Sequence, residues 1–170
     1  MAVKNRSYAN RGKFLENVID KANNKYRNVG VADVRKVPTP VKILNNTGNR
    51  ITGHLEKATW VDYTGVFKGK AIIFDAKETG ITNLPLDSIH THQYELLKSW
   101  HRKGAVAFLI VYFKLYDKYY LLPFETLREA WEIRENGGRK SIAYKTFENE
   151  GIKVNSKDGY TLHYLEALKI

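Results

Sequence analysis

The chain contains Trp60-Val61-Asp62-Tyr63-Thr64-Gly65-Val66-Phe67-Lys68-Gly69-Lys70-Ala71-Ile72-Ile73-Phe74-Asp75-Ala76-Lys77-Glu78, a stretch whose two halves are rich in β-branched and aromatic residues. The Lys68-Gly69 pair between the halves is typical of a turn, so the stretch is predicted to be a β-hairpin. Because side chains alternate along a strand, Asp75 and Lys77 are expected to share one face, with an apolar face behind them. The partner strand can bring Asp62 close to the same point.

Two carboxylates and a lysine on adjacent strands suit a divalent metal and a phosphodiester. Magnesium takes oxygen ligands, usually one or two protein carboxylates completed by water and phosphate. The ion lowers the pKa of a bound water, and a neighbouring lysine can orient that water or stabilise the transition state. Taken alone, however, an Asp-x-Lys motif is common and favours the alternative of an ordinary exposed pair.

Short motifs follow one another in a characteristic order along nearly the whole chain. They are Asn10-Arg11-Gly12, Leu15-Glu16, Pro38-Thr39-Pro40-Val41, Asp62-Tyr63, Gly65, Gly69-Lys70, Phe74, Ala76-Lys77-Glu78-Thr79, Pro85-Leu86, His90, His92-Gln93 and Gly138-Arg139-Lys140-Ser141-Ile142. Each motif is weak, but the ordered set is specific. The sequence resembles the RecU family of Holliday junction resolvases, within the PD-(D/E)xK nuclease superfamily.

The resemblance implies a restriction-endonuclease-like α/β fold, in which a mixed sheet is flanked by helices and a stalk hairpin protrudes. It implies symmetric paired nicking of Holliday junctions in DNA recombination and repair, with Mg²⁺ or Mn²⁺ as cofactor. It also implies a homodimer with one site per subunit and the two stalks together. The implied partners are four-way and other branched DNA, and recombinase and branch-migration proteins.

Site residues carry over from the family by position. Asp62 and Asp75 match the metal-binding acids, Lys77 matches the catalytic lysine, and Gln93 matches a glutamine of the metal site that acts through water or phosphate. Two positions depart from the family pattern. Asp75 stands where family members carry Glu, and Trp60 stands where the pattern has a threonine metal contact. Since tryptophan cannot replace a hydroxyl ligand, that contact is lost, made by backbone or displaced.

Residues 38–57 are predicted to form an insertion. The prolines of Pro38-Thr39-Pro40 exclude a central strand, and Val41–Leu44 and Ile51–Leu55 are predicted as two arms joined by the turn-rich Asn45–Asn49. The alternative is an ordinary surface loop. The resemblance implies a stalk that enters the opening of a four-way junction, where the residues able to meet phosphate are Lys42, Arg50, His54 and Lys57.

Two further basic segments are candidates for DNA contact. Residues 1–11 are expected to be a flexible arm that carries Arg11. The Arg139-Lys140-Ser141 sequence after a Gly pair could cradle a phosphate, although its spacing alone favours a solvated turn. His90 and His92 lack the i, i+4 spacing of a helical zinc pair, so zinc is not expected.

The composition predicts one ordered domain over residues 1–170. The chain has 43% hydrophobic and 12% aromatic residues, a net charge of +10 and no cysteine. A basic balance suits a polyanionic partner, and the absence of cysteine is compatible with a reducing cytoplasm. No secretory signal is recognised, and the longest apolar run, 105–113, is too short to span a membrane as a helix.

The remaining pattern is α/β. Helical spacing predicts a first helix over Lys13–Tyr26 that carries Glu16, which either faces the metal site or is solvated. The other predicted elements are a strand at Val29–Val37, a loop at Gly80–Asp87, a helix from an N-cap at Ser88 to about Arg102, a buried strand at Ala105–Phe113, a strand at Tyr119–Leu122, helices at Phe124–Glu135 and Tyr144–Glu150, and a helix or strand at Tyr160–Leu168.

Three other functions stay open. The nearest is a nuclease of the same superfamily acting on linear or fork DNA, which absence of a stalk would favour. The second is a non-catalytic or differently specific branched-DNA-binding protein on the same scaffold, because Trp60 and Asp75 both alter the expected metal shell. The third is a basic accessory factor, such as an RNA-binding protein, in which the Asp-x-Lys hairpin is coincidental.

Overall fold

A six-stranded mixed sheet forms the centre of the computed structural model, which describes residues 12–56 and 59–170. The strand order is β1 (Ala32–Lys36), β4 (Tyr63–Phe67), β5 (Lys70–Thr79), β7 (Val106–Phe113), β8 (Lys118–Pro123) and β10 (Ile152–Val154). Neighbours are antiparallel except β5 and β7, which are parallel. The predicted arm with Arg11, and Lys57 of the predicted stalk, lie outside the described residues.

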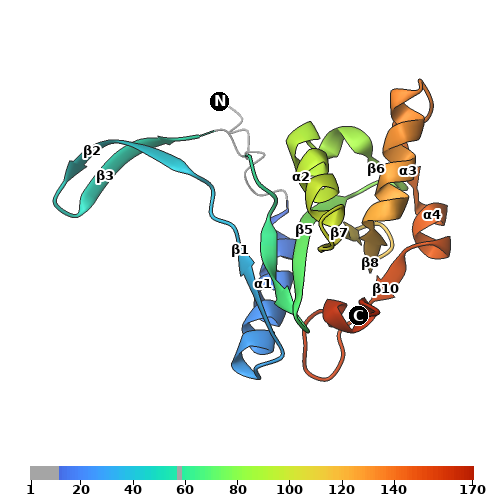
Figure 1. Cartoon of the computed structure of the whole chain (residues 1–170), viewed down its shortest axis with the longest axis horizontal. Helices are drawn as coiled ribbons and strands as arrows, with labels where there is room; N and C mark the ends of the chain where they lie inside the picture. Colours follow the sequence, from blue (N-terminus) through green and yellow to red (C-terminus); the bar gives the residue numbers. More distant parts are fainter. Residues whose placement is uncertain (1–11, 57–58) are drawn as a thin grey trace, which may run out of the picture.

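Helices cover both faces of the sheet (Figure 1). A parallel strand pair needs a crossover connection, and α2 (Thr91–His101) lies in the one between β5 and β7. It packs with α3 (Phe124–Glu135) on one face, and α1 (Lys13–Asn28) lies on the other. Strand β5 is therefore buried on both sides. Ile72 and Phe74 face the α1 core, as predicted, while Ile73 on the face of Asp75 belongs to a second core.

A two-stranded hairpin projects from the body of the molecule (Figure 1). Its strands are β2 (Val41–Thr47) and β3 (Arg50–Leu55), and every residue in both is exposed. The turn is shorter than the predicted Asn45–Asn49, because pairing continues to Thr47 and Arg50. Gly48 has a φ of 61°, which a glycine adopts without steric cost. A bulge between Ile43 and Asn45 interrupts the register.

Two predictions about the segment after β5 are wrong. The predicted loop contains β6 (Asn83–Pro85), which pairs with β9 (Ser141–Ala143). The predicted N-cap, Ser88, ends the short 3₁₀ helix η2 (Leu86–Ser88), and its hydroxyl donates to the Pro85 carbonyl at 2.6 Å. Residue His90 caps α2 instead.

The remaining elements are α4 (Tyr144–Asn149) and η3 (Tyr164–Ala167), so the C-terminal segment left open between helix and strand is a 3₁₀ turn. Within the described part of the chain, no helix has the length and apolar character needed to cross a membrane.

Candidate active site

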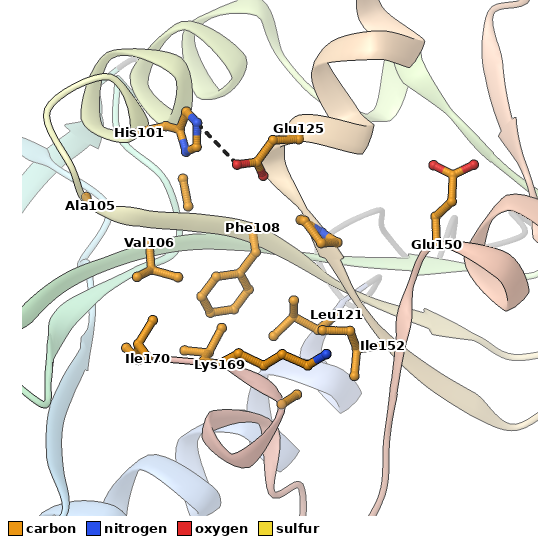
Figure 2. A pocket seen from close by; sticks show the side chains of 14 residues that line it. His101, Ala105, Val106, Phe108, Leu121, Glu125, Glu150, Ile152, Lys169 and Ile170 are labelled. Carbon is orange, nitrogen blue, oxygen red and sulfur yellow. Dashed lines mark ion pairs between the residues drawn. The ribbon is translucent and has the colours of Figure 1, made fainter.

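A pocket of about 580 Å³ at the start of β7 does not contain the predicted site (Figure 2). Its described lining is largely apolar and includes Val106, Phe108 and Leu121, with His101 Nε2 lying 3.4 Å from Glu125 Oε1 at one side. Neither Asp62 nor Asp75 lines it. The candidate site therefore lies at the acids. Their chemistry supports a catalytic role, whereas a pocket by its shape alone does not.

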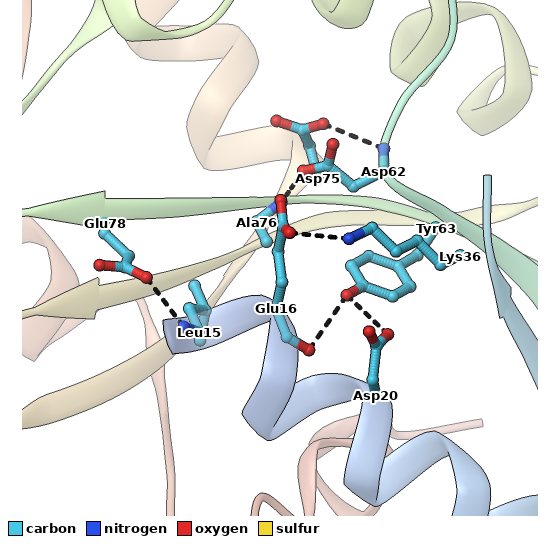
Figure 3. A network of polar contacts seen from close by, with 9 residues as sticks. All are labelled: Leu15, Glu16, Asp20, Lys36, Asp62, Tyr63, Asp75, Ala76 and Glu78. Atoms are coloured by element: carbon cyan, nitrogen blue, oxygen red, sulfur yellow. Dashed lines mark hydrogen bonds and ion pairs between the residues drawn. The ribbon is translucent and has the colours of Figure 1, made fainter. Parts of the chain in front are cut away.

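The two predicted acids meet where β4 and β5 pair (Figure 3). Asp62 immediately precedes β4, and Tyr63 pairs with Phe74, which places Asp62 next to Asp75. The Asp62 backbone N–H donates to Asp75 Oδ1 at 3.2 Å, and the Ala76 backbone N–H donates to Asp62 Oδ2 at 3.0 Å. Asp75 is fully buried. The hairpin therefore fixes both carboxylates through the backbone.

Lys77 and Gln93 complete the polar cluster. Lys77 Nζ lies 2.6 Å from Asp75 Oδ2 and donates to Gln93 Oε1 at 3.1 Å. Gln93 Nε2 donates to Asp75 Oδ1 at 2.8 Å. Asp75 Oδ2 accepts no well-directed hydrogen bond from the described residues, so its contact with Lys77 is an ion pair. Charge compensation of the buried acid thus depends on one ammonium group.

Gln93 is positioned by the first turn of α2. Its Oε1 accepts a hydrogen bond from the His90 backbone N–H at 3.0 Å, while the His90 side chain accepts one from the Gln93 backbone N–H. This reciprocal capping box satisfies donors that a helix start leaves unpaired. The same interaction holds the glutamine amide against Asp75, so helix capping and site geometry are joined in one residue.

The electrostatics of the cluster favour a bound cation. Burial, followed by the charge of Asp75, raises the pKa of Asp62 to about 7, against the opposing effects of the Ala76 N–H and Lys77. Two close carboxylates with one ammonium group carry an excess of negative charge that a divalent ion would neutralise. Oxygen donors suit magnesium. No group of three or more His, Cys, Asp or Glu residues among those described could hold a metal.

Glu16 lies beside this cluster rather than within its hydrogen bonds (Figure 3). Its Oε2 is 2.7 Å from Lys36 Nζ, and its backbone carbonyl accepts from the Tyr63 hydroxyl at 3.3 Å. That hydroxyl also donates to Asp20 Oδ1 at 2.9 Å. Glu16 thus forms an ion pair with β1, and a solvated or a metal-facing role for its carboxylate stays a prediction.

Sequence reasoning missed the part played by Glu78. Its Oε1 accepts the Leu15 backbone N–H at 2.8 Å, and its Oε2 lies 2.6 Å from Lys114 Nζ. The available signal was its place next to Lys77, since alternation along β5 directs it to the opposite face. Glu78 therefore ties the start of α1 to the strand that carries Asp75.

Comparison with known proteins gives a match over almost all of the chain. The family model for Recombination protein U, RecU, matches residues 10–170. The chain belongs to the RecU family. Relatives named Holliday junction resolvase RecU include one from Oenococcus oeni, 39% identical over 169 residues, which cover 95% of this chain and 86% of the relative.

Two further RecU relatives with the same name give similar values. The one from Pediococcus pentosaceus is 36% identical over 168 residues, covering 95% of this chain and 84% of the relative. The one from Bacillus cereus is 35% identical over 173 residues, covering 98% of this chain and 86% of the relative. The six-stranded mixed sheet with helices on both faces agrees with the restriction-endonuclease-like fold expected for the RecU family.

The described basic residues predicted to contact DNA lie in two other parts of the chain. Lys42 and Arg50 are exposed on the projecting hairpin, where Lys42 pairs with His54. Arg139 and Lys140 are exposed between α3 and β9, and the Lys140 carbonyl accepts the Leu86 N–H at 2.9 Å. The structure thus brings together the four residues predicted for catalysis and metal binding, whereas the described basic residues predicted for DNA lie on the projecting hairpin and between α3 and β9.

Proposed function

We propose that the chain is a metal-dependent endonuclease that resolves Holliday junctions by symmetric paired nicking during DNA recombination and repair. The observation that carries the proposal is the cluster of Asp62, Asp75, Lys77 and Gln93 in a chain of the RecU family. The three relatives described above bear the name of this activity.

Asp62 and Asp75 would hold Mg²⁺, or Mn²⁺, with Gln93 acting on a bound water or on the phosphate. When bound, the ion lowers the pKa of its water and neutralises charge that develops at phosphorus. The raised pKa of Asp62 supports this assignment, because burial and the charge of Asp75 disfavour its ionised form, which a bound cation would stabilise. The chain's own acids therefore supply both the ligands and the electrostatic need for a cation.

Lys77 would orient the attacking water and stabilise the charge that develops on the phosphate. Its Nζ is already held between Asp75 and Gln93. A donor fixed in this way needs little reorganisation as the transition state forms, which is the source of its catalytic effect. Gln93 contributes by holding Lys77 and Asp75 at fixed positions, through the two ends of its amide.

We assign residues 1–170 to a single nuclease domain in which the β2–β3 hairpin is the stalk. Alternation along β3 places Arg50 and His54 on one face, together with Lys42, which pairs with His54. That face suits the phosphates at the centre of a junction. Arg11, Arg139 and Lys140 would contact phosphates of the arms.

Two symmetric nicks require two sites, and we propose a homodimer with one site per subunit. The second face of the hairpin supports association of the two stalks, since Val41, Ile43, Ile51 and Leu55 are all exposed there. A cytoplasmic location, and recombinase and branch-migration proteins as further partners, complete the proposal.

The test uses a labelled synthetic four-way junction and a linear duplex of matching sequence, with Mg²⁺ and then with EDTA. We expect paired nicks on the junction alone, abolished in Asp75→Asn and in EDTA. Equal nicking of the junction and the linear duplex would assign the chain as a general nuclease and not as a resolvase. Tight junction binding without nicking in Mg²⁺ or Mn²⁺ would instead identify a branched-DNA-binding protein on the same scaffold.

A further inference from the structure

An exposed tryptophan lies beside the acid pair. Trp60 is 40% exposed, and its ring centroid lies 5.8 Å from that of Trp100 at an interplanar angle of 88°. Trp100 is partly buried against the α2–α3 core. Two residues of chain span at most about 7 Å, so the backbone of Trp60 lies close to Asp62.

A hollow of about 400 Å³ continues from Trp100 away from the acids. Its lining residues are Gly69, Lys70, Ala71, Trp100, Lys103 and Gly104, together with Ala105. Helix α2 thus lies along β5, with Gln93 at Asp75 and Trp100 near Ala71. The four residues from Ala71 to Asp75 correspond to about 13 Å of strand.

The charge around this hollow is predominantly positive. Lys70 and Lys103 line it and are exposed. A second hollow, of about 500 Å³, adjoins it through Lys103 and adds Lys98 and Arg102, against the single acid Glu95. Ammonium and guanidinium groups beside an exposed indole match the two parts of a nucleotide, because phosphate binds the cations and a base stacks on the ring.

We propose that Trp60, Trp100, Lys70 and Lys103 form a subsite for unpaired DNA nucleotides next to the nuclease site. The inference rests on the proposed function. Even at the duplex rise of 3.4 Å per nucleotide, the distance of about 13 Å along β5 corresponds to no more than roughly four nucleotides from the phosphate at the acids. Bases inside a duplex are stacked on both neighbours, so only nucleotides that are unstacked at a branch point or in a single strand can reach the indoles. The subsite would therefore distinguish branched DNA from a continuous duplex.

The test compares Trp60→Ala and Trp60→Phe with Phe14→Ala, an exposed aromatic residue on α1 that serves as the matched control. Binding is measured in EDTA to a four-way junction, to a linear duplex and to a single-stranded oligothymidylate. We expect Trp60→Ala to weaken junction and single-strand binding by roughly 5- to 150-fold, and duplex binding by less than about twofold. Trp60→Phe should restore most of the loss, and Phe14→Ala should change none of the three.

A spectroscopic measurement separates stacking from a structural role. The chain has three tryptophans, of which Trp131 is buried. In a Trp131→Phe background the tryptophan fluorescence comes from Trp60 and Trp100 alone, and binding of oligothymidylate should quench it. Thermal melting by circular dichroism confirms folding of each variant. If wild type fails to nick junctions, the proposed function fails while quenching still tests the subsite.

Three results would overturn the subsite. Equal loss of junction and duplex affinity in Trp60→Ala would assign Trp60 to general DNA contact. Absence of quenching by the oligothymidylate would exclude stacking. Conversion of a dimer into a monomer by Trp60→Ala, measured by light scattering, would make this surface an interface between copies of the chain.

Discussion

Asp62 donates its backbone N–H to the carboxylate of Asp75, and the amide one residue beyond Asp75 donates to the carboxylate of Asp62. Each carboxylate is therefore held by a backbone N–H of the chain segment that carries the other acid. A one-residue slip between β4 and β5 would break both contacts and turn the acids to opposite faces. The register of one antiparallel pair thus determines whether the site exists.

Replacement of Asp62 by Asn should stabilise the metal-free protein while abolishing nicking. The pKa of Asp62 is raised to about 7, so the folded state binds its proton more tightly than the unfolded state. The contribution of Asp62 to the wild-type free energy of unfolding must then fall as the pH rises from about 4 to about 7. The gain in Asp62→Asn, measured by urea unfolding in EDTA, should be near zero at pH 4 and on the order of 2 kcal/mol at pH 8.

Asp33→Asn is the matched control for this series. The exposed Asp33 carboxylate has a lowered pKa because of its hydrogen bond with Arg35. Its removal should therefore give no gain in the free energy of unfolding at pH 8. A gain in Asp62→Asn that is independent of pH would contradict the assignment of a buried, unfavourable charge.

Lys77→Met should slow nicking and destabilise the metal-free protein. The substitution leaves the fully buried Asp75 without its ion-pair partner, which costs about 3–5 kcal/mol for a buried pair. Nicking under single-turnover conditions should fall by about 10²- to 10³-fold. Calorimetry should show that Mn²⁺ binding is retained. Lys77→Arg keeps the charge and should recover stability more than activity; the reverse pattern would argue against the proposed roles.

Gln93→Glu should make folding depend on a divalent metal. The change replaces the Nε2 donor, 2.8 Å from Asp75 Oδ1, by an oxygen and adds a third carboxylate. The melting temperature in EDTA should fall, and Mg²⁺ should raise it more than in wild type. Gln93→Met removes the same hydrogen bonds without adding charge, so it should be destabilised without a larger Mg²⁺ response. An equal rise of the melting temperature on addition of Mg²⁺ in the two variants would refute the prediction.

The double variant Lys42→Gln, Arg50→Gln should weaken junction binding and reduce its salt dependence. Each phosphate contact contributes about 0.9 to the slope of log K against log salt concentration, so the slope should decrease by up to about 1.8. Lys153→Gln, on β10 at the sheet edge opposite β1, is the control. An unchanged slope in the double variant would remove the hairpin from the set of phosphate contacts.

Gly65→Ala should unfold the protein at lower urea concentration. A Cβ at this position would lie 2.3 Å from the Asp33 carbonyl oxygen and 2.5 Å from Val34 Cα, so β1 would have to separate from β4. We expect a loss of about 2 kcal/mol or more, as for an overpacked core position. Gly80→Ala, where a Cβ meets open space, should be nearly neutral. A neutral Gly65→Ala would show that the two strands are less tightly packed than described.

Patterns of local origin were predictable from the sequence. Alternation and the Lys68-Gly69 turn gave β4 and β5, and hence the approach of Asp62 to Asp75. Helical spacing located α1 and α3, and the unbroken apolar run located β7. These elements are specified by neighbours in the chain, so periodicity detects them.

Features that depend on distant contacts were not predictable. Strands β6 and β9 have three residues each and show no period, so their pairing needed the folded structure. Serine is a residue type typical of an N-cap, but the Ser88 hydroxyl donates to a carbonyl of the preceding 3₁₀ turn instead. The contact of Gln93 with Asp75 was available only through family resemblance, and the pairing of Trp60 with Trp100 had no sequence signal.

The crossover between β5 and β7 has a consequence for the order of folding. Asp62, Asp75 and Lys77 belong to a hairpin with short sequence separations, which we expect to form early because little chain entropy is lost on closure. Gln93 should reach Asp75 only when α2 docks and β5 pairs with β7, which we expect to be the slower, non-local step. A chain still folding would therefore hold its acids and lysine without the amide that fixes them. We therefore expect the proposed site to become competent last, once the whole sheet is in place.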